Sequence, residues 1–129
     1  MRKTVGPARI VVLEVDPGRG FSVYRIVRSE YLDDPVFLNS LRSNYELDHP
    51  PRGVERSSTV IHMGVSAYIS EYLAQQTAQR WEKLGDYIAE VQLAPGRGFN
   101  FAYTGHPQHL TIWADPVKLR EAVVGIRPA

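Results

Sequence analysis

The chain contains no cysteine, and this absence excludes two kinds of stabilising site. Disulfide bonds and thiolate metal sites both require cysteine side chains. A chain without cysteine also suits a reducing compartment, so we expect a cytoplasmic location.

Long hydrophobic runs and a strong excess of one charge are missing as well. No apolar stretch approaches the roughly 20 residues that span a bilayer. The short apolar run near the N-terminus contains Glu14, so we expect a strand there and not a signal peptide or membrane anchor. The formal net charge is only +1, which gives no overall attraction to nucleic acid or anionic lipid. We therefore expect no membrane partner, and the net charge also does not favour nucleic acid as a partner.

What is present suits one globular domain that spans residues 1–129. Hydrophobic residues make up 43% of the chain, enough to bury a core. Alternating apolar runs predict strands, and apolar residues at helical spacing after Asp34, Ser70 and Asp115 predict helices. The predicted strands are 9–15, 21–28, 59–63, 86–93, 100–103, 109–113 and 123–126, and the predicted helices are 35–45, 71–84 and 116–122. This pattern indicates an α+β fold, a single compact domain of about six short, mostly antiparallel strands with two or three helices.

The pentapeptide PGRGF occurs twice, at residues 17–21 and 95–99. Each copy separates an apolar run from an alternating aromatic run. A Pro-Gly pair is typical of a type II turn, and neither copy enters a helix as a phosphate-binding loop does. We interpret both copies as strand-to-strand turns. The first is predicted to close a hairpin between residues 9–15 and 21–28.

Arg25 and Ser66 are the first candidates for a binding site. Arg25 shares a strand face with three apolar residues, Phe21, Val23 and Val27. A charge on such a face indicates either that the face lines a cleft or that Arg25 pairs with a carboxylate. Gly64 would let the backbone approach a ligand and Ser66 could then bond it, although the segment could equally be a strand end with a bulge.

The histidines give a weaker signal. His106 and His109 are three residues apart, but zinc needs three or four ligands, so we expect no metal. Neither a Ser-His-Asp order nor a paired-carboxylate motif is present. His62 and His109 are nevertheless polar groups next to predicted strands.

Several pieces of the chain, taken in order, resemble the ADP-ribosyltransferase superfamily, including its toxin-like, RES-type and RNA 2′-phosphotransferase branches. Tyr24 and Arg25 lie on an early predicted strand, and GVSAY (residues 64–68) resembles the serine motif at a strand end. The alanine-rich segment YLAQQTAQRW follows, and HLTIW (residues 109–113) is in the place of the late strand that carries the family's catalytic glutamate.

This resemblance implies that the domain binds NAD or a related nucleotide as a cofactor or substrate. Arg25 would hold the nucleotide together with Tyr24, Gly64 and Ser66. The glutamate position is occupied by Gln108 and His109, which supply no negative charge for a cationic transition state. Catalysis is therefore in doubt. The RNA 2′-phosphotransferase branch uses Arg and His residues, which makes His62 and His109 the candidate catalytic residues if the protein is an ADP-ribosyl or phosphoryl transferase.

A non-enzymatic interaction domain is the alternative. The aromatic residues of FSVYRIV and FNFAY could then form the interface of a homodimer or of one half of a bacterial two-protein system. Together with nearby arginines they could also hold a nucleic acid, although the net charge does not favour this.

Overall fold

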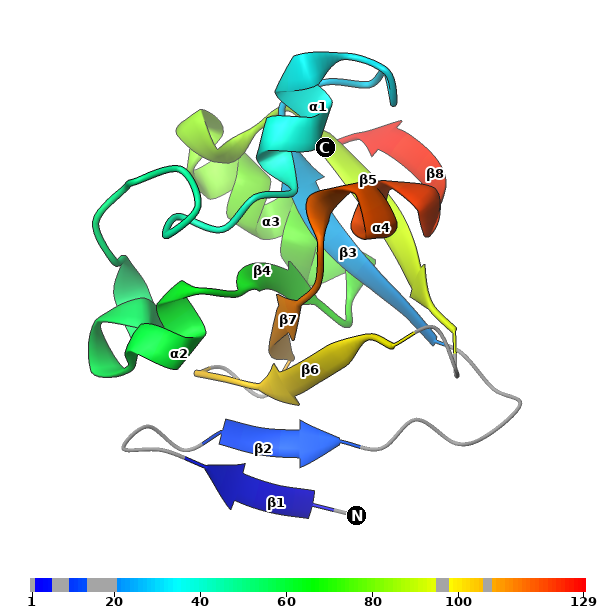
Figure 1. The fold of residues 1–129 in the computed structure, drawn as a ribbon. Helices are drawn as coiled ribbons and strands as arrows, with labels where there is room; N and C mark the ends of the chain where they lie inside the picture. Colours follow the sequence, from blue (N-terminus) through cyan, green and yellow to red (C-terminus); the bar gives the residue numbers. More distant parts are fainter. Residues whose placement is uncertain (1, 6–9, 14–20, 95–97, 106–107) are drawn as a thin grey trace.

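Figure 1 shows the fold in the computed structural model, which describes residues 2–5, 10–13, 21–94, 98–105 and 108–129. The strands are β1 (Arg2–Val5), β2 (Ile10–Leu13), β3 (Phe21–Val27), β4 (Val65–Tyr68), β5 (Tyr87–Leu93), β6 (Asn100–Tyr103), β7 (His109–Trp113) and β8 (Val123–Pro128). The helices are α1 (Pro35–Ser40), α2 (Thr59–His62), α3 (Glu71–Arg80) and α4 (Pro116–Glu121), with 3₁₀ turns η1 (Gly53–Ser57) and η2 (Glu82–Leu84).

All eight strands belong to one sheet, in the order β1-β2-β6-β7-β4-β3-β5-β8, and every neighbouring pair is antiparallel. This confirms the predicted α+β class and the antiparallel pairing. No helix in the described part of the chain is long and apolar enough to cross a membrane.

The sheet is interrupted between β3 and β4. β3 pairs with β5 along its whole length, from Phe21 to Val27, but in the described chain it pairs with β4 only through Tyr24 and Tyr68. We call this interruption the seam. It divides the sheet into one half made of β1, β2, β6, β7 and β4, and another made of β3, β5 and β8.

The two halves share a core, which shows that the sheet is rolled. Phe21 of β3 and Phe101 of β6 are three strands apart in the sheet order, yet their ring centroids are 5.2 Å apart in an edge-to-face contact. The same cluster includes Val23 and Leu93 from one half and Leu110 from the other. Burying such side chains from both halves supplies most of the stability of a fold of this kind.

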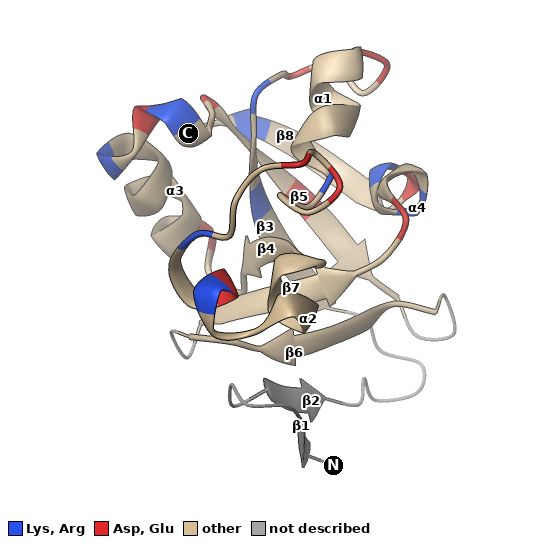
Figure 2. Ribbon diagram, turned by 60° about the vertical axis from the view of Figure 1, so that its left-hand side comes forward, with Lys and Arg blue, Asp and Glu red and all other residues tan. Residues whose placement is uncertain are grey.

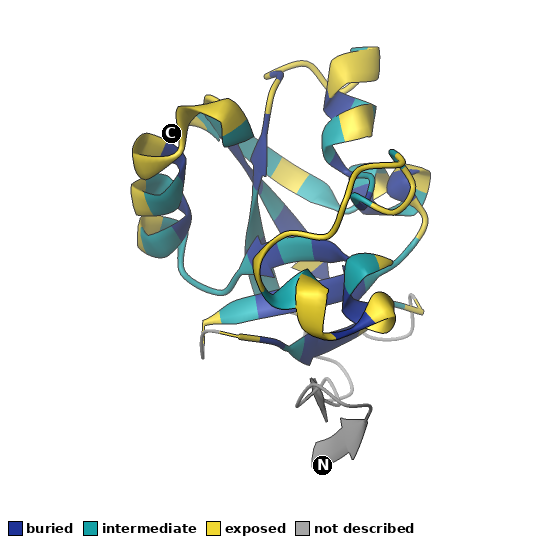
Figure 3. Cartoon of the chain, turned by 90° about the vertical axis from the view of Figure 1, so that its left-hand side faces the viewer, coloured by how far each residue is buried: buried dark blue, intermediate teal, exposed yellow. Residues whose placement is uncertain are grey.

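Helices cover both faces of the rolled sheet (Figures 1 and 3). α1 and α4 add Phe37 and Leu119 to the core between the halves, which we call the inner face. α3 packs Ala74 and Ala78 on the opposite, outer face of β3 and β5. Figure 2 shows both basic and acidic residues on α3 and on α4.

The predicted helix starts are confirmed. Oδ1 of Asp34 accepts a 2.9 Å bond from the amide of Val36, and Oδ1 of Asp115 accepts a 2.8 Å bond from the amide of Val117. Oγ of Ser70 accepts a 3.2 Å bond from the amide of Leu73. The helix ends were predicted too late, because α1 stops at Ser40 and α3 stops at Arg80.

Two local predictions are wrong. The segment 59–63 is not a strand, since Thr59–His62 forms helix α2 and the strand begins only at Val65. A short apolar run does not distinguish a strand from a helix, and here Ile61 alone of the helix is fully buried, against Ala102. The hairpin between β2 and β3 does not form either, because β2 pairs with β1 and β6.

The two PGRGF segments therefore connect the halves of the sheet. Residues 17–20 and 95–97 lie outside the described residues, but the strands on either side of them are placed. One segment links β2 to β3 and the other links β5 to β6. Because β2 is beside β6 and β3 is beside β5, the two connections begin and end next to each other.

Candidate functional site

The side chain of Arg25 lies in the seam and bridges three elements. Its Nη1 donates a 2.9 Å hydrogen bond to the main-chain oxygen of Ser66 on β4. Its Nε donates a 3.0 Å bond to the main-chain oxygen of Ser40, the last residue of α1. A guanidinium thus takes the place of the strand pairing that is missing between β3 and β4.

The guanidinium of Arg25 is charged but has no ion-pair partner among the described residues. Burial lowers its pKa to about 10, while Tyr68 and Glu55 act in the opposite direction. A group with this pKa is still protonated near neutral pH. The predicted pairing with a carboxylate is therefore absent at contact distance within the described chain, and Glu55 acts only from further away.

One nitrogen of Arg25 remains available. Nη2 makes no hydrogen bond within the described chain, whereas Nε and Nη1 are both bonded. No side-chain nitrogen or oxygen of the described residues is both fully buried and unbonded. It follows that Nη2 is not fully buried.

The structure joins the side chain of Arg25 to the main chain of Ser66, so the Ser66 hydroxyl takes no part in the contact. Tyr24 is paired with Tyr68, which places Tyr24, Tyr68 and Ser66 on the outer face and Arg25 on the inner one. The close approach that Gly64 allows is to β7 of the protein itself. A Cβ at this position would lie 2.2 Å from Cγ2 of Thr111.

His109 and Tyr24 also lie on the outer face. His109 is paired with Tyr68, and their rings are in edge-to-face contact with centroids 5.3 Å apart. Nδ1 of His109 lies 2.8 Å from the main-chain oxygen of Thr104. Burial raises the pKa of the Tyr24 phenol, and the carboxylates of Glu90 and Glu71 raise it further. Tyr24 and His109 are thus separated from Arg25 by the sheet.

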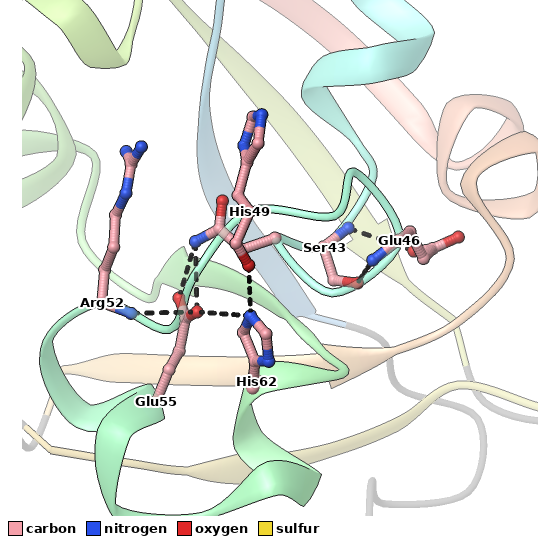
Figure 4. Close-up of polar contacts among 7 residues, drawn as sticks. Ser43, Glu46, His49, Arg52, Glu55 and His62 are labelled. Carbon is pink, nitrogen blue, oxygen red and sulfur yellow. Dashed lines mark hydrogen bonds and ion pairs between the residues drawn. The ribbon is translucent and has the colours of Figure 1, made fainter.

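His62 belongs to a different polar group, which Figure 4 shows around Glu55. Nε2 of His62 lies 2.9 Å from the main-chain oxygen of His49 and 3.8 Å from Oε1 of Glu55. Nδ2 of Asn44 donates bonds of 3.1 Å to both Glu55 oxygens, and the amide of Arg52 donates a 3.3 Å bond. Only 11% of the Glu55 side chain is exposed, so its carboxylate is held firmly in place.

The carboxylate of Glu55 raises the pKa of Arg25, although the described structure has no ion pair between the two residues. We call Arg25, Glu55, His62 and Ser66 the seam site. Sequence reasoning missed Glu55, since a glutamate between Val54 and Arg56 is typical of an exposed turn. Its partners Asn44 and His62 are 11 and seven residues away in the sequence, with no regular spacing that would indicate them.

The described residues contain no group of three or more His, Cys, Asp or Glu side chains that could hold a metal ion. No family model, curated protein or solved structure matches the chain.

Proposed function

We propose that the seam site binds NAD or a related nucleotide, in a domain of ADP-ribosyltransferase type. The resemblance in the sequence requires an early arginine strand, a serine strand and a late strand to meet at one site. In the sheet these are β3, β4 and β7, and they are consecutive neighbours. The order of the strands therefore supports the proposal.

The observation that carries the proposal is the state of Arg25. Its guanidinium is charged, is fixed by two main-chain oxygens, and keeps Nη2 unbonded and not fully buried within the described structure. Arginine recognises phosphate and carboxylate groups through such donors. A guanidinium that is already fixed loses little conformational entropy on binding, so a nucleotide phosphate or ribose is a suitable ligand.

Glu55 supplies the negative charge that the late strand lacks. When the bond between a ribose and nicotinamide breaks, positive charge develops at C1′ of the ribose, and a fixed carboxylate stabilises it. Asn44 and the Arg52 amide hold the Glu55 carboxylate before any ligand arrives. In this proposal Glu55 takes the role that Gln108 and His109 cannot fill.

Isothermal titration calorimetry with NAD tests the binding. We expect a measurable Kd for the native chain and a loss of at least tenfold in affinity in Arg25→Gln. Arg28→Gln is the matched control, because Arg28 is exposed and only its main-chain amide is bonded in the described structure. Circular dichroism verifies that Arg25→Gln is folded, and Arg25→Lys, which keeps the charge, serves if it is not.

Two results contradict the proposal. One is the absence of heat and of any rise in melting temperature at millimolar NAD, since a ligand at 100 times its Kd adds about 2.7 kcal/mol to the stability. The other is unchanged NAD affinity in a folded Arg25→Gln protein.

A non-enzymatic interaction domain remains the alternative hypothesis. The aromatic side chains predicted to form its interface, however, pack within the protein itself. Phe101 is only 3% exposed, and Phe21, Tyr24 and Tyr103 pack against core clusters. The edge strand β8 is also poorly suited to pairing with a second copy. Val124 is an extra residue in a β-bulge opposite Glu90 and Val91, and such bulges protect sheet edges.

A further inference from the structure

We infer that Ser40 is a positioning residue for nucleotide binding: its hydroxyl and its main-chain oxygen together hold the end of α1 against β3 and fix the guanidinium of Arg25. In this role Ser40 acts through Arg25 and does not contact the nucleotide. The inference rests on the proposed function, because Ser40 affects nucleotide binding only if Arg25 binds the nucleotide.

Ser40 is hydrogen-bonded to the β3 segment in both directions. Its main-chain oxygen accepts the 3.0 Å bond from Nε of Arg25, within β3. Its Oγ accepts a 3.0 Å bond from the main-chain amide of Arg28, the residue that follows β3. The first bond ties a side chain of the strand to the helix, and the second ties the main chain at the end of the strand to the same residue. The oxygen that Arg25 bonds is therefore held in place relative to the strand that carries Arg25.

The bonds of the Ser40 hydroxyl determine its orientation. A hydroxyl has one hydrogen to donate and two lone pairs that accept. Oγ of Ser40 donates its hydrogen to the main-chain oxygen of Val36, one helical turn earlier, at a distance of 2.9 Å. The lone pairs remain for the amide of Arg28. A single side-chain oxygen thus connects the last turn of α1 to the end of β3.

The place of Ser40 at the end of α1 explains why its main-chain oxygen is available to Arg25. The last four main-chain oxygens of a helix have no partner within the helix, and Ser40 is the last residue of α1. The side chains of Phe37 and Leu41 are buried in the core and anchor the helix independently of Ser40. Removal of the hydroxyl should therefore loosen the end of α1 without unfolding the protein.

Two bonds from different nitrogens orient the guanidinium. Ser40 holds Nε and Ser66 holds Nη1, so the plane of the group cannot turn about either bond. If the bond to Ser40 is weakened, the group can turn about its remaining bond to Ser66. That freedom must then be lost when the nucleotide binds, and ordering one flexible side chain weakens binding about three- to tenfold.

Ser40→Ala and Ser40→Thr test this role by isothermal titration calorimetry with NAD. We expect Ser40→Ala to bind NAD about three- to tenfold more weakly than the native chain, and Ser40→Thr, which keeps the hydroxyl, to restore most of the affinity. Thr77→Val is the matched control. Oγ1 of Thr77 also donates to a main-chain oxygen one turn earlier, that of Leu73, but it does so in α3 on the outer face. Its loss should leave NAD affinity unchanged.

The same substitution in an Arg25→Gln background distinguishes positioning from a general loss of structure. If Ser40 acts through Arg25, Ser40→Ala has no further effect on the NAD affinity of Arg25→Gln. A purely structural effect would lower the affinity by the same factor in both backgrounds. Equal factors would therefore overturn the inference.

The Hε proton of Arg25 gives a readout that requires neither a ligand nor a variant. A proton in a hydrogen bond to a main-chain oxygen exchanges with water more slowly than an unbonded one. By nuclear magnetic resonance we expect Hε of Arg25 in the native chain to exchange more slowly than Hε of Arg28, whose side chain makes no bond in the described structure. In Ser40→Ala this difference should shrink, and in Ser40→Thr it should persist.

The outcomes separate this inference from the proposed function. If the native chain does not bind NAD, or if folded Arg25→Gln binds it equally well, the proposed function fails and this inference fails with it. If NAD binding requires Arg25 but folded Ser40→Ala has native affinity, only the inference about Ser40 is overturned. The same holds if Hε of Arg25 exchanges as fast as Hε of Arg28 in the native chain.

Discussion

Arg25 donates from Nη1 to the main-chain oxygen of Ser66 at 2.9 Å, across the junction where β3 and β4 pair only through Tyr24 and Tyr68 in the described chain. This bond and the bond to Ser40 make the side chain a structural link as well as a candidate ligand-binding group.

Removing the guanidinium should therefore destabilise the fold even without a ligand. Arg25→Gln cannot reach both oxygens, and each half-buried acceptor left unbonded costs about 1–3 kcal/mol. We expect the free energy of unfolding in urea to fall by about 2–4 kcal/mol. The exposed Arg28 should tolerate the same substitution within about 0.5 kcal/mol. A loss of similar size in both variants would show that the seam does not depend on Arg25.

Gly85 should be irreplaceable for steric reasons. A Cβ there would lie 2.2 Å from the main-chain oxygen of Val27, at a φ of 149°. We expect Gly85→Ala to cost more than about 3 kcal/mol, since the backbone of β3 must move. Gly53→Ala is the control, because Gly53 has a φ of 55° but no atom within 4 Å of its added Cβ. Its cost should be only the backbone strain, about 1–2 kcal/mol, measured by thermal unfolding.

The ion pairs of Arg127 should make the free energy of unfolding depend on pH in the acidic range. Nη2 of Arg127 lies 2.8 Å from Oε1 of Glu71 and 2.7 Å from Oε1 of Glu90, and these bonds hold the pKa of both carboxyls below the ordinary value. A lowered folded-state pKa adds stability that is complete above the unfolded pKa, about 4.3, and is lost as the pH falls through the folded pKa.

Arg127→Met should remove this contribution. The groups are partly exposed, so we expect a loss of only about 1 kcal/mol near pH 7, with a shallower decline in stability between pH 5 and pH 3. Arg42→Met, which breaks the 3.8 Å surface pair with Glu46, should cost about 0.5 kcal/mol or less. An unchanged acid dependence in Arg127→Met would contradict the assignment.

The contact between Phe21 and Phe101 tests the rolled shape of the sheet. A double-mutant cycle with Phe21→Leu and Phe101→Leu should give a coupling energy of about 0.5–1.5 kcal/mol, as for other aromatic pairs. Ile88 packs in the separate cluster under α3, so a cycle of Phe101→Leu with Ile88→Val should give a coupling near zero. Equal coupling in the two cycles would mean that the halves do not meet as described.

The sequence predicted the helices and strands better than it predicted which strands pair with one another. The caps at Asp34, Ser70 and Asp115 were readable because each depends on residues two or three positions away. The pairing of β2 with β6 depends on residues about 90 positions apart, which no local pattern encodes. The sequence favoured a hairpin instead, as two apolar runs separated by a turn usually do.

The candidate site shows the same limit. A charge among apolar neighbours singled out Arg25 as a candidate, but its acceptors are main-chain oxygens, which every residue possesses. Glu55 became visible only when Asn44 and His62 were seen beside it. The pairing of both Tyr24 and His109 with Tyr68 places these two residues on the face of the sheet opposite Arg25.

The chain passes repeatedly between the two halves of the sheet. Among the described strands, β2 is followed by β3, β3 by β4, β4 by β5, β5 by β6 and β7 by β8, and each of these steps crosses from one half to the other. Neither half is therefore a continuous stretch of sequence, and residues that meet in the core, such as Phe21 and Phe101, are far apart along the chain. Because contacts between distant residues form slowly, this protein should fold more slowly than a helical bundle of the same length.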